Sequence, residues 1–211
     1  MHHLLLELRR KIKSPEHICE ESIRLLNEYE EEIVAEHSRR VANEAERLAV
    51  AFGEDSEAAR VAGILHDISA IIPDDIKLEI SEDLNIDILD EEREIPFIIH
   101  QKLSKEIARI VFGITDEQIL SAISCHTTLK ANPTKLDMIL FIADKLEWDQ
   151  KEIPPYYNMI QEGLKESLEC GTFRFIDYLY QDKSNLKVVH PWLVDAYNYF
   201  TKNKGYKPNV T

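Results

Sequence analysis

Apolar residues recur at intervals of three and four along most of the chain, while clean alternation of apolar and polar residues is almost absent. Such spacing places apolar side chains on one face of an α-helix. The pattern therefore predicts an all-α fold. Helices are predicted over about residues 15–30, 31–52, 56–67, 100–113, 115–126, 133–148, 156–171 and 191–202.

Residues that prefer helix ends refine these boundaries. Ser14 and Thr115 are predicted N-caps, Pro133 is predicted to begin a helix, and Gly171 is predicted to end one. Residues 72–96 are acidic and contain prolines, so short helices and loops that cover the core are predicted there, with a lid as the alternative.

The length of 211 residues suits one domain with a full hydrophobic core. We predict a globular unit over residues 31–205 with a helical extension, residues 1–30, packed on it. The first residues contain an apolar run of only three leucines, which is too short for a signal peptide or a membrane span. Cys19, Cys125 and Cys170 have no disulfide-like spacing, so reduced thiols and a cytoplasmic location are expected.

The chain carries 39 acidic against 25 basic residues, a formal net charge of −14. Binding to nucleic acid polymers depends on clustered lysine and arginine, which the sequence does not offer. A small phosphorylated ligand is still compatible with this charge if a cation neutralises the phosphates locally.

The inward faces of the predicted helices carry residues that can bind metal ions. Six such residues are His37, His66, Asp67, His100, His126 and Asp144. A single histidine on an apolar face is usually a core residue bonded to the backbone. A buried carboxylate costs several kcal/mol unless a cation or hydrogen-bond donors lie nearby. The economical interpretation is that the six residues converge on a divalent metal, and imidazole with carboxylate suits Fe, Mn or Zn.

The order of these residues, a distant His37, the pair His66-Asp67 and a distant Asp144, resembles the HD-domain metal-dependent phosphohydrolases, which are helical bundles. Within that superfamily the chain is most similar to the YqeK-type symmetrical bis(5'-nucleosyl)-tetraphosphatases. The stretches that carry the likeness include "AGILHDIS", "IPFIIHQKLSKEIAR" and "KLDMILFIADKLE". The likeness covers about residues 31–200, so residues 31–205 are interpreted as the HD domain.

The resemblance also implies roles for individual residues. The implied ligands of one divalent metal are His37, His66, Asp67 and Asp144. Iron is the expected metal, with manganese or zinc as alternatives. His100 and His126 are implied to bind a second ion or to contact phosphate. The implied substrate contacts are Thr127, Lys187, His190 and Trp192.

Basic residues that such enzymes usually carry are missing here. The positions concerned are occupied by Val34, Ala70, Gln150 and Tyr197. Each lost contact to a phosphate oxygen weakens binding by about 1.5–3 kcal/mol. Lys145, Lys102 and Lys130 are candidates to compensate, and Lys145 is the best placed because it follows Asp144. The metal ligands are thus retained while the polyphosphate contacts are fewer, which leaves the identity of the substrate open.

The implied reaction is hydrolysis of a nucleotide phosphoanhydride, with diadenosine tetraphosphate giving two ADP. The metal is expected to activate a water molecule, and Asp67 is expected to bridge or orient it as the catalytic carboxylate. Three alternatives remain: a phosphatase acting on another nucleotide, a non-catalytic module that binds metal and nucleotide, and a purely structural helical protein. A small nucleotide is the expected partner, without nucleic acid polymers or membranes, and a homodimer is implied by the resemblance alone.

Overall fold

A computed structural model describes residues 2–148 and 152–208, which form helices and connecting segments with no strand among them. The all-α prediction is confirmed. The first seven helices are α1 (His3–Lys11), α2 (Ile18–Glu28), α3 (Glu32–Phe52), α4 (Ser56–Leu65), α5 (Lys77–Asp83), α6 (Asp90–Glu94) and α7 (His100–Ile110). The others are α8 (Glu117–Cys125), α9 (Lys135–Leu146), α10 (Tyr157–Glu166), α11 (Leu168–Gln181) and α12 (Pro191–Asn198).

Short helical turns connect several of these helices. Four are 3₁₀ turns, namely η1 (Ile68–Ile71), η2 (Asp74–Ile76), η3 (Pro96–Ile99) and η4 (Lys183–Asn185). A turn of π-helix, η5 (Tyr199–Asn203), continues α12. The acidic stretch 72–96 therefore consists of short helices and turns, as predicted.

Both predicted N-caps are wrong. Ser14 lies in a turn, where its carbonyl accepts a hydrogen bond from the backbone N–H of His17, and α2 begins only after that turn. At α8 the cap is Asp116, whose carboxylate accepts from the backbone N–H of Gln118 at 2.8 Å. Thr115 precedes it, and because both residue types cap helices well, the sequence alone did not separate them.

The start of α9 is also one residue later than predicted. Thr134 is the N-cap, and its hydroxyl accepts from the backbone N–H of Asp137 while the Asp137 carboxylate accepts from the N–H of Thr134. This reciprocal capping box satisfies two helix-end donors at once. Pro133 therefore lies before the helix and does not begin it.

The predicted helix over 156–171 is two helices. Ser167 has an extended backbone with φ −167° and caps α11 by accepting from the N–H of Cys170 at 3.0 Å. Gly171 lies inside α11 instead of ending a helix. It faces Gly163 of α10, where an added Cβ would lie 2.7 Å from the Gly171 Cα. The two glycines thus permit α10 and α11 to cross at backbone contact.

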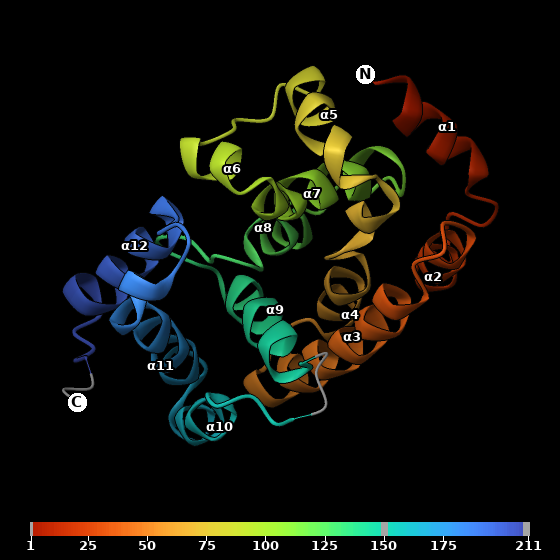
Figure 1. Ribbon diagram of the computed structural model, residues 1–211. Coiled ribbons are helices and arrows are strands. Elements are labelled where there is room, and N and C mark those ends of the chain that lie inside the picture. Colours follow the sequence, from red (N-terminus) through yellow and green to blue (C-terminus); the bar gives the residue numbers. More distant parts are fainter. Residues whose placement is uncertain (1, 149–151, 209–211) are drawn as a thin grey trace.

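The centre of the molecule is built from α3, α4, α7, α8 and α9 (Figure 1). In α3, the apolar stripe predicted from the sequence is buried at Val41, Ala45 and Leu48, while Val34 and Phe52 are half-buried. The N-terminal helices α1 and α2 and the C-terminal helices α10 to α12 lie on opposite sides of this centre (Figure 1).

The N-terminal helices contribute to the same hydrophobic core. Leu5 and Leu8 of α1 and Leu25 and Leu26 of α2 are each at most 1% exposed and belong to the cluster that includes the central helices. The division into an extension, residues 1–30, and a main unit, residues 31–205, stays a prediction. In the described part of the chain, no helix is long and apolar enough to cross a bilayer, and the cysteines are free thiols.

Candidate metal centre

The six residues with metal-ligand chemistry are brought together by five segments of the chain. His37 comes from α3, the pair His66-Asp67 directly follows α4, His100 begins α7, His126 follows α8 and Asp144 lies in α9. They form three overlapping groups, and within each group the donor atoms lie within 4.8 Å of one another. These groups are His37 with His66 and Asp67, His66 with His126 and Asp144, and Asp67 with His100 and His126.

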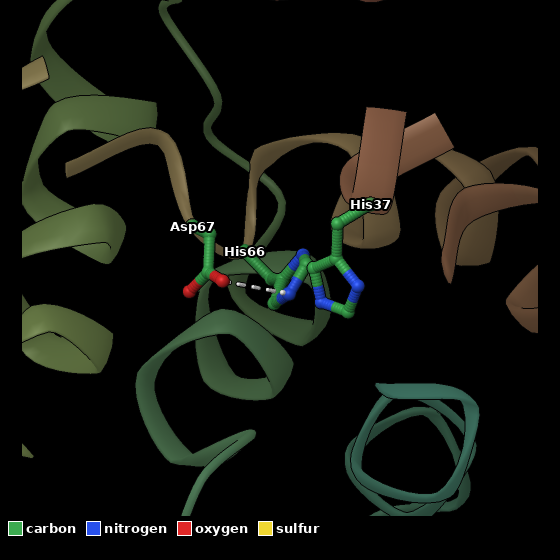
Figure 2. A group of neighbouring side chains, drawn as sticks. All are labelled: His37, His66 and Asp67. Carbon is green, nitrogen blue, oxygen red and sulfur yellow. Dashed lines mark ion pairs between the residues drawn. The ribbon is translucent and has the colours of Figure 1, made fainter. Parts of the chain in front are cut away.

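The two carboxylates connect the histidines into one cluster. Asp67 Oδ2 lies 3.3 Å from His66 Nε2, whereas its Oδ1 lies 3.3 Å from His100 Nε2 and 3.4 Å from His126 Nε2. Asp144 Oδ1 lies 3.2 Å from His37 Nε2 and 3.7 Å from His66 Nε2. Figure 2 shows the His66 imidazole between the ring of His37 and the carboxylate of Asp67.

Three of the histidines are oriented by the same local contact. The Nδ1 atoms of His66, His100 and His126 each lie 2.6–2.9 Å from the backbone carbonyl three residues earlier in the chain. A carbonyl only accepts, so Nδ1 carries the proton in each ring and Nε2 faces the centre of the cluster. This arrangement fixes the tautomer that a metal ligand needs.

The donor atoms that result are suited to a cation. Nε2 of His66 is buried and makes no hydrogen bond. Nε2 of His100 and Nε2 of His126 lie only 2.9 Å apart, and with both Nδ1 atoms protonated the neutral rings would point lone pairs at each other. A shared cation or an added proton relieves that repulsion. The donor set therefore fits a divalent metal.

The charges in the cluster also favour binding of a cation. Burial lowers the pKa of His66, but the carboxylates of Asp67 and Asp144 outweigh burial and raise it to about 9. Burial raises the pKa of Asp67, yet the surrounding imidazoles, His66 first, hold it well below its usual range. For His100, burial prevails and lowers the pKa to about 4 against the attraction of Asp67. The carboxylates thus draw positive charge to this point, which is what metal binding requires.

Buried polar contacts hold the segments of the cluster in register. The hydroxyl of Ser69, two residues after Asp67, donates to the His100 carbonyl at 3.1 Å, and Ser104 donates to Ser69 at 3.0 Å. On the other side, the fully buried Gln101 accepts from the backbone N–H of Thr127 at 3.2 Å. These bonds tie the HD pair to α7, and α7 to the turn after His126.

The cluster opens into a cavity of about 300 Å³. It is lined by His37, Asp67, Phe97, His100, His126, Thr127, Asp144, Lys145, Glu147 and Trp148. Two of the predicted substrate contacts are therefore at the cluster. Thr127 Oγ1 lies 3.1 Å from His100 Nε2, and Lys145 Nζ lies 2.5 Å from Asp144 Oδ2.

The other predicted substrate contacts lie elsewhere. His190 Nδ1 accepts from the Trp192 backbone N–H at 3.2 Å as the N-cap of α12, and His190 Nε2 faces Glu92 at 3.4 Å. Trp192 lines a different cavity of about 370 Å³, which shares no lining residue with the cavity at the cluster, here called the metal cavity. Lys187 is exposed and lines neither cavity. Their predicted role in nucleoside binding therefore gains no support from their position.

All three lysines considered as phosphate contacts pair with a carboxylate, but Lys102 and Lys130 do not line the cavity. Lys102 is buried, and its Nζ lies 2.7 Å from Glu92 Oε2. Lys130 Nζ lies 3.2 Å from Asp137 Oδ2. Lys145 is thus the candidate that reaches the cavity.

The positions that lack the usual basic residues are a mixed set. Val34 and Ala70 are half-buried. Tyr197 stacks on Tyr180 with ring centroids 3.7 Å apart. Gln150 lies outside the described residues.

Two residues on the cavity wall were missed by sequence reasoning, namely Phe97 and Glu147. Phe97 lies in the apolar run "IPFII", and the simplest interpretation of an aromatic residue in such a run is that it packs in the core. Its position three residues before His100 is the available signal, because its carbonyl accepts from His100 Nδ1 at 2.6 Å. Glu147 directly follows α9, and its carboxylate lies 3.4 Å from Nε of Arg40.

Comparison with known proteins agrees with this geometry. The HD domain family model matches residues 34–149, more than half of the chain. A protein of Lactococcus lactis subsp. cremoris, described as an uncharacterised protein in the pepC 5' region, is 49% identical over 65% of this chain and 70% of its own length. A symmetrical bis(5'-nucleosyl)-tetraphosphatase of Staphylococcus aureus is 35% identical over 53% of this chain. That match spans 57% of the tetraphosphatase, so the chain covers little more than half of this relative.

A solved structure extends the likeness to nearly the whole fold. A predicted HD superfamily hydrolase involved in NAD metabolism from Clostridium acetobutylicum superposes with a TM-score of 0.79 at 28% identity, covering 91% of this chain and 99% of that one. Together, the helical fold, the cluster of imidazoles and carboxylates, and these relatives define a metal-dependent phosphohydrolase. Within that class, the chain belongs to the HD domain family. The resemblance stated from the sequence is confirmed.

Proposed function

We propose that this protein hydrolyses a phosphoanhydride bond of a nucleotide, with diadenosine tetraphosphate split into two ADP as the substrate. The observation that carries the proposal is the convergence of His66, His100 and His126 on Asp67, each imidazole facing this carboxylate through Nε2 at 3.3–3.4 Å, with Asp67, His100 and His126 lining the cavity. The symmetrical tetraphosphatases among the relatives supply the substrate.

The proposed ligands of the first metal are His37, His66, Asp67 and Asp144. Iron is the proposed metal, with manganese or zinc as alternatives, because neutral imidazole with carboxylate suits all three. His100 and His126 are proposed to hold a second ion or to contact phosphate. When bound, the cation supplies Lewis-acid chemistry, since it lowers the pKa of a water molecule and offsets the charge of the phosphate group.

Asp67 is the proposed catalytic carboxylate. Its two oxygens face different histidines, Oδ2 towards His66 and Oδ1 towards His100 and His126. A carboxylate placed between two donor groups can orient a water molecule and accept a hydrogen bond from it. Lys145 is proposed to contact a phosphate oxygen through a charge-assisted hydrogen bond, and Thr127 to contact the same group through its hydroxyl.

A nucleotide with fewer phosphates is the second candidate substrate. Among the described residues that line the cavity, Lys145 is the one lysine or arginine. A tetraphosphate chain carries several negative charges, and the whole chain has a formal net charge of −14. A mononucleotide carries less negative charge and needs fewer positively charged contacts, so this observation favours it over the tetraphosphate. A non-catalytic module that binds nucleotide at the same cavity is the third possibility.

The decisive experiment is an assay of a nucleotide panel with Fe²⁺, Mn²⁺ and Co²⁺. The panel contains diadenosine tetraphosphate, ATP and AMP, and products are separated by chromatography. We expect the tetraphosphate to give two equivalents of ADP. His66→Ala and Asp67→Ala should abolish turnover, and His66→Ala should also lose bound metal by elemental analysis. Glu94→Gln, which changes an exposed carboxylate that does not line the cavity, is the matched control.

The possible outcomes separate the proposals. Turnover of ATP or AMP without turnover of the tetraphosphate would select the smaller substrate. Binding of ADP without turnover of any nucleotide under all three metals would select the binding module. Retained turnover in Asp67→Ala would rule out the proposed site.

A further inference from the structure

The rim of the metal cavity carries two aromatic side chains that are exposed to solvent. Phe97 is 63% exposed and Trp148 is 39% exposed, and both line the cavity. They are two of the six large apolar side chains that the described residues expose. Exposed aromatic surface is disfavoured by water, and two such rings on the rim of one polar cavity are typical of a ligand-binding groove.

Two contacts with His100 place Phe97 at this rim. Phe97 belongs to η3, and its carbonyl accepts from His100 Nδ1 at 2.6 Å. Its ring centroid lies 4.9 Å from that of His100. Phe97 thus orients His100 through its backbone carbonyl and places its own ring at the edge of the same cavity.

Trp148 is held by a different contact. Its ring meets Tyr156 at 89°, with ring centroids 5.9 Å apart. This edge contact fixes the ring at the end of α9, close in sequence to Asp144 and Lys145. The cavity therefore combines charged groups suited to phosphate with an aromatic rim.

We infer that Phe97 stacks on the nucleobase of the substrate, with Trp148 as a second aromatic contact on the same rim. The inference rests on the proposed function and assigns the part of the substrate that the metal donors do not explain. With the phosphates placed at the imidazoles and Lys145, the planar base is the part left to meet the rim. Stacking on an aromatic face tolerates any base.

The test compares two ligands that carry the same number of phosphates, with and without a nucleoside. Equilibrium dissociation constants for ADP and for inorganic pyrophosphate are measured by calorimetry in the presence of Mn²⁺. In Phe97→Ala we expect the Kd for ADP to rise about 5- to 100-fold, as for the loss of one stacked ring. The Kd for pyrophosphate should stay within about twofold, because alanine keeps the carbonyl that orients His100.

Two further variants control for folding and for loss of the ring as such. Phe97→Tyr retains a stacking face and should restore the wild-type Kd for ADP. Val50→Ala removes an apolar side chain that is 68% exposed near the C-terminal end of α3, and it should change neither constant. Trp148→Ala should raise the Kd for ADP in the same direction as Phe97→Ala.

Two results would overturn the inference. Equal weakening of ADP and pyrophosphate in Phe97→Ala would show that the ring acts by supporting His100. Unchanged affinity for both ligands would show that the ring does not meet the base. Neither result bears on turnover, so the assay of the nucleotide panel decides the proposed function separately.

Discussion

Glu92 is a carboxylate with no exposed surface, and its partners explain how the chain tolerates it. Lys102 Nζ lies 2.7 Å from Oε2, the Leu89 backbone N–H donates to the same oxygen at 2.8 Å, and His190 Nε2 faces Oε1 at 3.4 Å. Burial raises the pKa of Glu92, but the hydrogen bonds from His190 and Lys102 outweigh it and leave the pKa below 4.5. A buried ion pair of this kind is costly to break from one side.

We predict that Glu92→Gln lowers the free energy of unfolding by about 3 kcal/mol at pH 7, because Lys102 would be left buried without a counter-charge. Since the pKa of Glu92 is lower in the folded than in the unfolded state, the wild-type advantage is fully present above about pH 4.5. It should diminish as the pH falls through the folded-state pKa. Urea unfolding of both proteins between pH 7 and pH 3.5 measures this.

The matched control is Glu82→Gln. Glu82 pairs with Arg93 at 2.7 Å, and both side chains are at least 50% exposed. Such a pair contributes about 0–1 kcal/mol, so the control should differ little from wild type at any pH. A Glu92→Gln penalty that stayed constant down to pH 3.5 would contradict the assigned cause.

Single residues were predictable from the sequence where periodicity marked them. His37, His100, His126 and Asp144 stood out because each interrupts an apolar helical stripe. The role of His190 was not predictable, because its partner Glu92 lies 98 residues away in an acidic stretch without periodicity. Pairings between distant segments leave no local pattern.

Packing of α4 against α3 depends on Gly63. A Cβ at Gly63 would lie 2.6 Å from the Cα and 2.9 Å from the N of Ala42, which are backbone atoms that cannot move aside. The Gly63 carbonyl also accepts from His66 Nδ1 at 2.8 Å. The distance between the two helices and the orientation of His66 are therefore set at the same residue.

We predict that Gly63→Ala destabilises the protein by about 1–3 kcal/mol, the usual range for overpacking. Alanine improves helix propensity by about 0.5–1 kcal/mol, which is too little to reverse the sign. Separating α4 from α3 should also weaken metal binding by about 10- to 100-fold, as for loss of a group that orients a ligand. Chemical denaturation and metal titration measure the two effects.

Gly171→Ala separates the two effects. A Cβ at Gly171 would lie 2.6 Å from Leu164 Cδ2 in the crossing of α10 and α11. That variant should lose stability and keep its affinity for metal, because neither helix carries a donor of the cluster. If Gly63→Ala bound metal as tightly as Gly171→Ala does, α4 packing would not position His66.

At the level of helices, periodicity predicted where the long ones lie but not where helices break. α10 and α11 form one uninterrupted apolar pattern, and Ser167 divides them because a tight crossing through Gly163 and Gly171 requires a turn there. That crossing is a tertiary contact, so the pattern along the chain does not contain it. Caps were misplaced by a single residue where two capping residues adjoin, as at Thr115 and Asp116.

In the whole molecule, the candidate metal ligands come from α3, α7 and α9 and from the residues that directly follow α4 and α8. The donors are spread over more than a hundred residues, from His37 to Asp144. In an unfolded chain these donors are far apart, so an ion binds the folded state in preference to the unfolded one. Without an ion, the charge of Asp67 and Asp144 is balanced in part by a proton on His66, whose pKa is raised to about 9. A divalent ion would supply more positive charge at the same place.

Metal removal should therefore destabilise the whole fold. With free Mn²⁺ at about 100 times its Kd, linkage adds about 2.7 kcal/mol to the free energy of unfolding, which for a domain of this size raises the Tm by about 5–10 °C. We predict a fall of that size on treatment with a chelator and recovery when Mn²⁺ is restored. His66→Ala should have the same Tm with and without Mn²⁺, because it lacks a ligand of the cluster. Scanning calorimetry of both proteins decides it: an equal response to Mn²⁺ in wild type and His66→Ala would place the stabilising ion outside this cluster.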